Sequence, residues 1–321
     1  MSYSAEAGTH LRAVYEARLD PGVAQAHLGM TDTLTVDVDR IGELRTVRAA
    51  SFRAPDPRLR HQDIEVLTAA GGQFPLRIHR PDDDSCLPCI YWIHGGGYMF
   101  GSFRADEERV DAWVDGLSCA VVTPDYRLAP EHPYPTPLND CVAGLDWVMA
   151  HADQVGIDST RIIVAGASAG GGLAAALCLF ARDRGDPLIS AQVLLYPMLD
   201  DRFRDYPSSS IWTPRWGAAA NVAGWEAYLG SQEHESPRRY AVAGREENLR
   251  GMPTSFISVA ELDVLRDEAI RFASRLVEAD VPTELHLYRG APHGFDKSAP
   301  ESVPARRMSD DLLAFLRAEL G

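Results

Sequence analysis

The chain has 321 residues, 45% of them hydrophobic, which is enough to bury a sizeable core in one large domain or two average ones. Its 31 basic and 46 acidic residues give a net charge of −15, which repels the phosphates of nucleic acids and of anionic membranes. We therefore expect no nucleic-acid partner.

No run of about 18 consecutive apolar residues occurs, and residues 1–20 lack the basic start and apolar core of a signal peptide. The protein is therefore expected to be cytoplasmic, with no stable membrane insertion. The five cysteines are few and odd in number. Cys86 and Cys89 have redox spacing, but Cys89 leads into an apolar strand and not into a helix, so we expect structural cysteines and no metal site.

The predicted elements alternate along most of the chain. Residues 63–67 and 74–79 flank Gly71 and Gly72, which predicts an opening β-hairpin. Six more strands are predicted, at residues 90–93, 120–123, 161–165, 192–196, 256–259 and 283–288. Helical patterns follow or separate them, at residues 106–117, 138–151, 169–182, 266–279 and 304–320. This alternation predicts an α/β fold, a mostly parallel eight-stranded sheet flanked by helices.

Two regions do not follow the alternation. Residues 1–50 are helix-like and precede the sheet, and residues 200–250 form a long insertion rich in Trp, Tyr, Pro and Ser. Such insertions are usually lids or binding elements. The alternative, a surface insertion exposed to solvent, is disfavoured because side chains such as Trp212 and Trp216 are too apolar to remain in contact with water. We therefore predict a catalytic domain over residues 51–321, with residues 1–50 and 200–250 forming a cap.

Gly166, Ser168 and Gly170 form a G-x-S-x-G pattern between an apolar strand and an alanine-rich helix. In this setting the serine lies on a strained turn with its hydroxyl exposed, and the glycines make room for that turn. A helix start that only packs or binds phosphate is the alternative. The context favours Ser168 as a nucleophile.

A glycine-rich run, His94-Gly95-Gly96-Gly97, directly follows the strand at residues 90–93. Glycines allow backbone N–H groups to face a site without obstruction by a Cβ atom. Two N–H groups of this loop, together with that of Ala169, can receive the negative charge of a tetrahedral intermediate. A simple tight turn is the alternative interpretation.

A serine nucleophile needs a base and an orienting carboxylate. In α/β folds that carry the serine on such a strand-turn-helix, the acid comes next along the chain and the histidine comes last. Asp263 and His293 each come at the carboxyl end of a predicted strand, the edge that also carries Ser168. Glu261 and Asp267 remain alternatives to Asp263. His286, within a strand, and His132 are expected to be structural.

Together these motifs resemble the hormone-sensitive-lipase-like branch of the α/β-hydrolases, a family of bacterial esterases and lipases. The resemblance covers the chain from about residue 87 onward. It is carried by the runs at residues 94–97, 125–135, 166–170, 263–268 and 292–295. The family implies that Ser168, Asp263 and His293 form a catalytic triad.

The same resemblance implies that Gly96, Gly97 and Ala169 donate to the oxyanion, while His94 and Gly95 shape the loop. One position departs from the family pattern, because the residue before the nucleophile is usually acidic and here is Ala167. This difference leaves the triad intact.

The function expected from these residues is hydrolysis of short- to medium-chain carboxylic esters through an acyl-enzyme intermediate. The partner is a small-molecule acyl ester, no cofactor is needed, and a homodimer is left open. Hydrolysis of an amide, lactone, thioester or carbamate is an alternative, because all pass through a tetrahedral intermediate. A ligand receptor on the same fold, like the plant gibberellin receptors, is disfavoured because those receptors lack the triad histidine that His293 supplies here.

Overall fold

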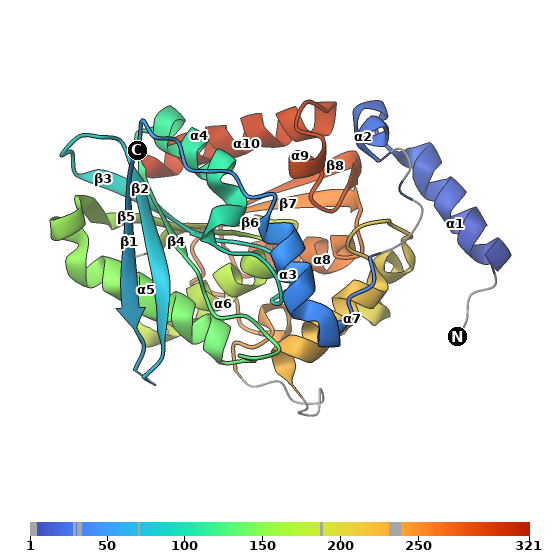
Figure 1. Cartoon of the computed structure of the whole chain (residues 1–321), viewed down its shortest axis with the longest axis horizontal. Coiled ribbons are helices and arrows are strands. Elements are labelled where there is room, and N and C mark those ends of the chain that lie inside the picture. The colour runs from blue at the N-terminus through green and yellow to red at the C-terminus, as the bar shows by residue number, and fades with distance from the viewer. Residues whose placement is uncertain (1–4, 28–29, 31–33, 70, 187–188, 231–238) are drawn as a thin grey trace.

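Eight strands form one sheet in the computed structural model, which describes residues 5–27, 30, 34–69, 71–186, 189–230 and 239–321. Their order across the sheet is β1-β2-β4-β3-β5-β6-β7-β8, and Figure 1 shows helices on both faces. β1 pairs antiparallel with β2, and β2 with β4, whereas the remaining neighbours are parallel. The strands are β1 (Arg60–Leu67), β2 (Gln73–Arg80), β3 (Leu87–Ile93), β4 (Ala120–Pro124), β5 (Ile157–Ala167), β6 (Ile189–Leu195), β7 (Thr254–Leu262) and β8 (Thr283–Pro292).

The predicted α/β class and the eight predicted strands are confirmed, although several strands are longer than expected. β5 begins at Ile157, which pairs with Leu87, four residues before the predicted start. The polar residues 158–160 interrupt the apolar pattern there, so the pattern alone does not reveal this part of the strand.

The five predicted helices are also present, in two layers. α4 (Glu107–Leu117) and α10 (Val303–Leu320) cover one face of the sheet, while α5 (Thr136–Val155), α6 (Ala169–Arg184) and α8 (Arg266–Glu278) cover the other. The remaining helices are α1 (Ala5–Arg18), α2 (Pro21–Ala26), α3 (Ile41–Ala49), α7 (Ala218–Leu229) and α9 (Phe295–Ser298). Short 3-10 turns are η1 (Val38–Arg40), η2 (Phe103–Asp106), η3 (Phe203–Asp205), η4 (Pro207–Ser210) and η5 (Ala243–Arg245). None of the described helices is long and apolar enough to span a membrane.

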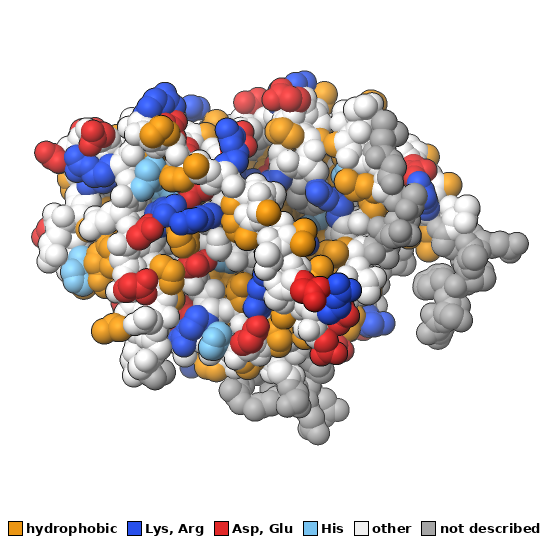
Figure 2. Space-filling view, in the orientation of Figure 1, with side chains coloured by type: hydrophobic (Ala, Val, Ile, Leu, Met, Phe, Trp, Pro, Cys, Tyr) orange, Lys and Arg blue, Asp and Glu red, His pale blue; other side chains and the backbone are white. Residues whose placement is uncertain are grey.

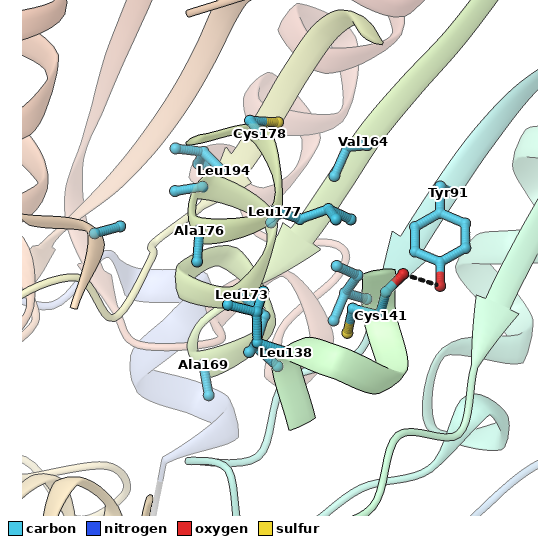
Figure 3. Close-up of a cluster of buried hydrophobic side chains, with 14 of the residues drawn as sticks. Tyr91, Leu138, Cys141, Val164, Ala169, Leu173, Ala176, Leu177, Cys178 and Leu194 are labelled. Carbon is cyan, nitrogen blue, oxygen red and sulfur yellow. Dashed lines mark hydrogen bonds between the residues drawn. The ribbon is translucent and has the colours of Figure 1, made fainter. Parts of the chain in front are cut away.

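Apolar side chains of α6 hold this helix against the sheet. Leu173 and Leu177 are 1% exposed and belong to the same buried cluster as Val164 of β5, and Figure 3 shows Leu177 pointing toward Val164. The polar tip of Tyr91 is also satisfied inside this core, because its hydroxyl donates to the Cys141 carbonyl oxygen over 3.0 Å. This packing fixes the first turn of α6, and therefore the residue that precedes it.

The fold brings the ends of four parallel strands to one edge of the sheet. β3, β5, β7 and β8 end at Ile93, Ala167, Leu262 and Pro292. The next residues along the chain are His94, Ser168, Asp263 and His293. Because parallel strands point the same way, these four residues lie at the same edge, where ligands bind in such sheets.

Candidate active site

Ser168 lies on a strained turn between β5 and α6. Its φ is 57° and its ψ is −122°, a region that non-glycine residues rarely adopt. Its N–H donates to the Leu195 carbonyl oxygen over 2.9 Å, and its carbonyl oxygen accepts from the N–H groups of Gly172 and Met198. These three bonds hold the turn in its strained geometry.

The glycines around Ser168 allow the close approach that this turn needs. A Cβ atom on Gly166 would lie 2.2 Å from the Gly170 carbonyl oxygen, and one on Gly170 would lie 2.2 Å from that of Ile93. Either contact is far inside van der Waals distance, so the G-x-S-x-G pattern has a steric reason at both ends.

Ser168, His293 and Asp263 are joined by hydrogen bonds. The Ser168 Oγ atom lies 2.9 Å from His293 Nε2, and His293 Nδ1 lies 2.6 Å from Asp263 Oδ2. The other carboxylate oxygen of Asp263 accepts the Leu265 N–H over 3.1 Å, which fixes its orientation. Asp263 is 1% exposed and Ser168 is 6% exposed, so the chain of bonds is shielded from bulk water.

The two alternative carboxylates point elsewhere. Glu261 accepts the Gly290 N–H over 2.7 Å and pairs with Arg18. Asp267 accepts the Ser208 N–H over 2.8 Å and pairs with Arg266. The two other candidate histidines also lie outside this group, since His286 contacts Glu284 and Asp311 and His132 is exposed.

The glycine-rich loop lies directly against Ser168. A Cβ atom on Gly95 would be 2.7 Å from the Ala167 carbonyl oxygen and 3.3 Å from Ser168 Cβ. Gly96 has a φ of 132° and Gly97 a φ of 60°, values that favour glycine. Ala169 begins α6, so its N–H belongs to the first helical turn, which has no partner within the helix.

His94 anchors the start of this loop from inside the protein. Its ring stacks on that of Tyr126, with centroids 4.3 Å apart, and its Nδ1 donates to the Gly95 carbonyl oxygen over 2.9 Å. The Tyr126 hydroxyl donates to the His94 carbonyl oxygen over 3.0 Å. Tyr126 belongs to the run at residues 125–135. Through Tyr126 this run supports the glycine-rich loop, and these contacts do not involve Ser168.

We expect acid to destabilise the protein through His94. Burial lowers the pKa of His94 to about 4, whereas the ordinary value is 6.5, so between these values the unfolded chain binds the proton and the folded protein does not. Stability therefore falls as the pH falls through this window, by about 2 kcal/mol between about pH 7 and pH 5.

This effect can be measured as the free energy of unfolding in urea at several pH values. His94→Gln is expected to lose about that amount of pH dependence, whatever its stability at neutral pH. His132→Gln, which changes an exposed histidine, is the matched control and should behave like the wild type. An unchanged pH dependence in His94→Gln would contradict the prediction.

The structure also reveals neighbours of His293 that the sequence analysis did not single out. The Tyr196 ring lies edge-on to the His293 ring at 5.0 Å, and its hydroxyl donates to Asp296 over 2.8 Å. Arg109 of α4 forms an ion pair with the same Asp296 carboxylate. Tyr196 directly follows β6, and Asp296 follows His293 by three residues. Their positions just after strands that end at the active-site edge were the sequence signal that could have identified them.

Trp216, from the insertion at residues 200–250, bounds the site on another side. A Cβ atom on Gly97 would lie 1.9 Å from the Trp216 ring, and the Trp216 and His293 rings are 6.5 Å apart. The Trp216 Nε1–H donates to Asn221 Oδ1 over 3.0 Å, which fixes the ring. Residues 231–238 of the predicted insertion lie outside the described residues.

The N-terminal segment contacts both the insertion and the sheet edge. The Tyr15 ring packs edge-on against Trp212 at 5.4 Å, and Arg18 pairs with Glu261 over 2.8 Å. In Figure 1, α2 lies beside α9, the short helix that follows His293. Residues 1–4, 28–29 and 31–33 of the predicted cap are outside the described part of the chain.

Comparisons with known proteins agree with this architecture. The sequence matches the family model described as alpha/beta hydrolase fold over residues 90–297. It is 37% identical over 243 residues to esterase LipI of Mycobacterium tuberculosis, covering 74% of this chain and 76% of LipI. It is 34% identical over 263 residues to carboxylesterase NlhH of the same organism, covering 79% of this chain and 82% of NlhH.

The fold is also similar to solved esterase structures. A bacterial heroin esterase superposes with a TM-score of 0.88 at 34% identity, over 95% of this chain and 99% of that one. Esterase LipW from Mycobacterium marinum gives a TM-score of 0.83 at 33% identity, over 95% and 96% of the two chains. The family resemblance predicted from the motifs is therefore confirmed, and the chain belongs to the alpha/beta hydrolase family.

Proposed function

We propose that this protein hydrolyses carboxylic esters, with Ser168 as the nucleophile, His293 as the general base and Asp263 as the carboxylate that orients the base. The hydrogen-bonded chain from Ser168 Oγ through both His293 ring nitrogens to Asp263 carries this proposal. The names of the relatives, esterase and carboxylesterase, support the reaction class.

In the proposed acylation step, His293 Nε2 takes the Ser168 hydroxyl proton as Oγ bonds to the ester carbonyl carbon. The tetrahedral intermediate then collapses, the bond to the alkoxy oxygen breaks, and His293 returns the proton to the leaving alcohol. Water attacks the acyl-enzyme with His293 again as base, which releases the acid and restores Ser168. Asp263 stabilises the imidazolium that forms in both steps.

The negative charge of each intermediate is proposed to bind the N–H groups of Gly96, Gly97 and Ala169. Two features support this assignment. The positive φ values of the two glycines favour residues without a Cβ atom, and the Ala169 N–H lies at the start of a long helix, where the partial positive charge favours an anion. His94 and Gly95 are proposed to support the loop.

Residues 1–50 and 200–250 are proposed to cap the site and to limit the acyl group. Trp216 is 6% exposed and borders His293, while Tyr15 of the N-terminal segment packs against Trp212 of the insertion. A covered apolar site rewards each buried methylene by about 0.8 kcal/mol until the acyl chain reaches a wall. The proposed substrates are therefore short- to medium-chain esters.

A panel of p-nitrophenyl esters tests both the reaction and the chain length. We expect kcat/KM to rise from acetate to a maximum between butyrate and octanoate and to fall for palmitate. The matching p-nitroanilides test the alternative of amide hydrolysis, and thioester, lactone and carbamate substrates complete the panel. Faster turnover of one of these classes, or a preference for emulsified long-chain triglycerides, would contradict the proposal.

A single substitution tests the proposed role of the cap in chain-length selectivity without changing a catalytic residue. Trp216→Ala should move the maximum toward longer acyl chains, because it removes the ring that borders Gly97 and His293. Trp147→Ala is the matched control, since Trp147 lies on α5 and stacks on His151. If both variants keep the wild-type chain-length profile, the proposed role of Trp216 is wrong.

The cytoplasmic location and the partners are proposed on other grounds. The five cysteines are free in the structure, and four of them are buried, as expected for a protein kept in a reducing compartment. The net charge of −15 opposes nucleic-acid binding, and the face in Figure 2 carries acidic and basic side chains interspersed with each other. A homodimer remains a prediction, which light scattering on the purified protein can test.

A further inference from the structure

Four side chains with metal-binding atoms converge between the β1–β2 hairpin and α4. His61 and His79 are cross-strand partners, and their Nδ1 atoms are 3.1 Å apart. Glu107 and Asp111 are one helical turn apart on α4, with Glu107 Oε2 3.7 Å and Asp111 Oδ1 3.9 Å from His79 Nδ1. The ligand atoms of His61, His79 and Asp111 all lie within 4.8 Å of one another.

The outward-facing atoms of three of these side chains are held by hydrogen bonds. His61 Nε2 lies 2.8 Å from the Asp56 carbonyl oxygen, which can only accept, so this nitrogen carries the hydrogen and His61 Nδ1 has a free lone pair. Asp111 Oδ2 accepts the Asp56 N–H over 2.8 Å. Glu107 Oε1 accepts from Arg77 over 2.8 Å.

His79 is held in the same manner. Its Nε2 lies 3.3 Å from the Thr123 hydroxyl, which donates its own hydrogen to the Arg77 carbonyl oxygen. The hydroxyl therefore accepts from His79 Nε2–H, which leaves His79 Nδ1 without a hydrogen. Such outer hydrogen bonds fix the tautomer and the direction of histidines that bind metals.

The inward-facing atoms are consequently all acceptors. Two imidazole lone pairs face each other at 3.1 Å, and Glu107 Oε2 and Asp111 Oδ1 are buried without a hydrogen-bond partner among the described residues. His79 is 0% exposed and Glu107 is 2% exposed, so bulk water does not reach these acceptors to donate hydrogen bonds. Buried acceptors that lack a partner are rare and costly, and a single cation among His61, His79 and Asp111 would satisfy three of them and attract Glu107 Oε2, which lies 3.7 Å from His79 Nδ1.

We propose that His61, His79, Glu107 and Asp111 form a binding site for a divalent transition-metal ion, with Zn²⁺ as the best match. Tetrahedral zinc bound to nitrogen and oxygen ligands separates neighbouring ligand atoms by about 3.3 Å, close to the 3.1 Å between the imidazole nitrogens. Glu107 Oε2 and Asp111 Oδ1 need to approach His79 Nδ1 by about half an ångström, and Glu107 needs a larger shift to join the other ligand atoms. The two nitrogen ligands disfavour Ca²⁺ and Mg²⁺, which prefer oxygen.

This site is structural and separate from the proposed active site. β1 and β2 form one edge of the sheet, while Asp263 and His293 follow β7 and β8 at the other edge (Figure 1). A bound ion connects the hairpin to α4, which otherwise contact each other through side chains at the edge of the sheet. The two carboxylates balance the charge of the ion while both histidines remain neutral.

The test uses the full-length protein without an affinity tag, treated with a chelator and dialysed. Isothermal titration with Zn²⁺ is expected to show one ion per chain, and Co²⁺ should give the visible absorption of a four-coordinate site. Zn²⁺ at about 100 times its Kd should raise Tm by about 4 °C. Turnover of p-nitrophenyl butyrate well below Tm should be unaffected by the chelator, which separates this result from the proposed function.

His61→Gln and Asp111→Asn should each abolish the one-to-one binding and the Tm increase while retaining ester hydrolysis, which shows that they fold. The matched controls are Asp115→Asn, an exposed carboxylate one turn further along α4, and His132→Gln, an exposed histidine. Both should bind Zn²⁺ like the wild type. Absence of stoichiometric binding, or equal binding by the site variants and the controls, would overturn the metal site in favour of a proton shared by the two imidazoles.

Discussion

Ser168→Ala is expected to lower kcat/KM for p-nitrophenyl butyrate by about 10⁴-fold or more, because it removes the atom proposed to form the acyl-enzyme. The substitution deletes only Oγ and the hydrogen bond of 2.9 Å to His293. The backbone keeps its positive φ, which costs alanine about as much as serine. Tm should therefore change by only a few degrees, and calorimetry can measure it.

A chemical experiment on the unmodified protein complements this variant. An organophosphonate should label Ser168, and mass spectrometry of the digested protein should find the label on the peptide that contains it. Ser274→Ala, which changes an exposed serine on α8, is the control and should keep both turnover and labelling. Wild-type turnover in Ser168→Ala, or a label on another serine, would show that the nucleophile is assigned wrongly.

The sequence predicts much of this architecture because the relevant signals are local. Residues 161–170 have the pattern of an apolar strand followed by a serine between glycines, and the structure has β5, the turn and α6 there. The carboxylate that orients the base is harder to identify from the sequence, because Glu261, Asp263 and Asp267 all lie near the end of β7. Only the directions of their side chains distinguish them, and these directions depend on partners far away in the sequence, such as Arg18 and Ser208.

The features that the sequence analysis did not find are contacts between distant elements. Tyr196 and Arg109 meet at Asp296, although the three residues belong to different parts of the chain. His61 lies outside the strand predicted at residues 63–67, so its pairing with His79 was not expected. A longer predicted hairpin would have aligned them, since the register matches Leu67 with Gln73 and His61 with His79. The carboxylates of α4 would still have been missed.

Asp263→Asn is expected to lower kcat by about 10³- to 10⁴-fold, with the fold unchanged. An asparagine can still accept the Leu265 N–H through its oxygen, which turns its NH₂ group toward His293 Nδ1. That nitrogen must then act as an acceptor, so the ring hydrogen moves to Nε2 and faces Ser168. In this tautomer the imidazole has no lone pair for the Ser168 proton.

The other two carboxylates provide matched controls for this prediction. Glu261→Gln still accepts the Gly290 N–H and loses an exposed ion pair with Arg18, a pair worth less than about 1 kcal/mol. Asp267→Asn likewise retains an oxygen for the Ser208 N–H. Both variants should keep kcat within about a factor of ten of the wild type, since neither contacts His293. If Asp267→Asn or Glu261→Gln, with its fold intact by circular dichroism, loses as much activity as Asp263→Asn, then the hydrogen bond of 2.6 Å to His293 does not identify the orienting acid.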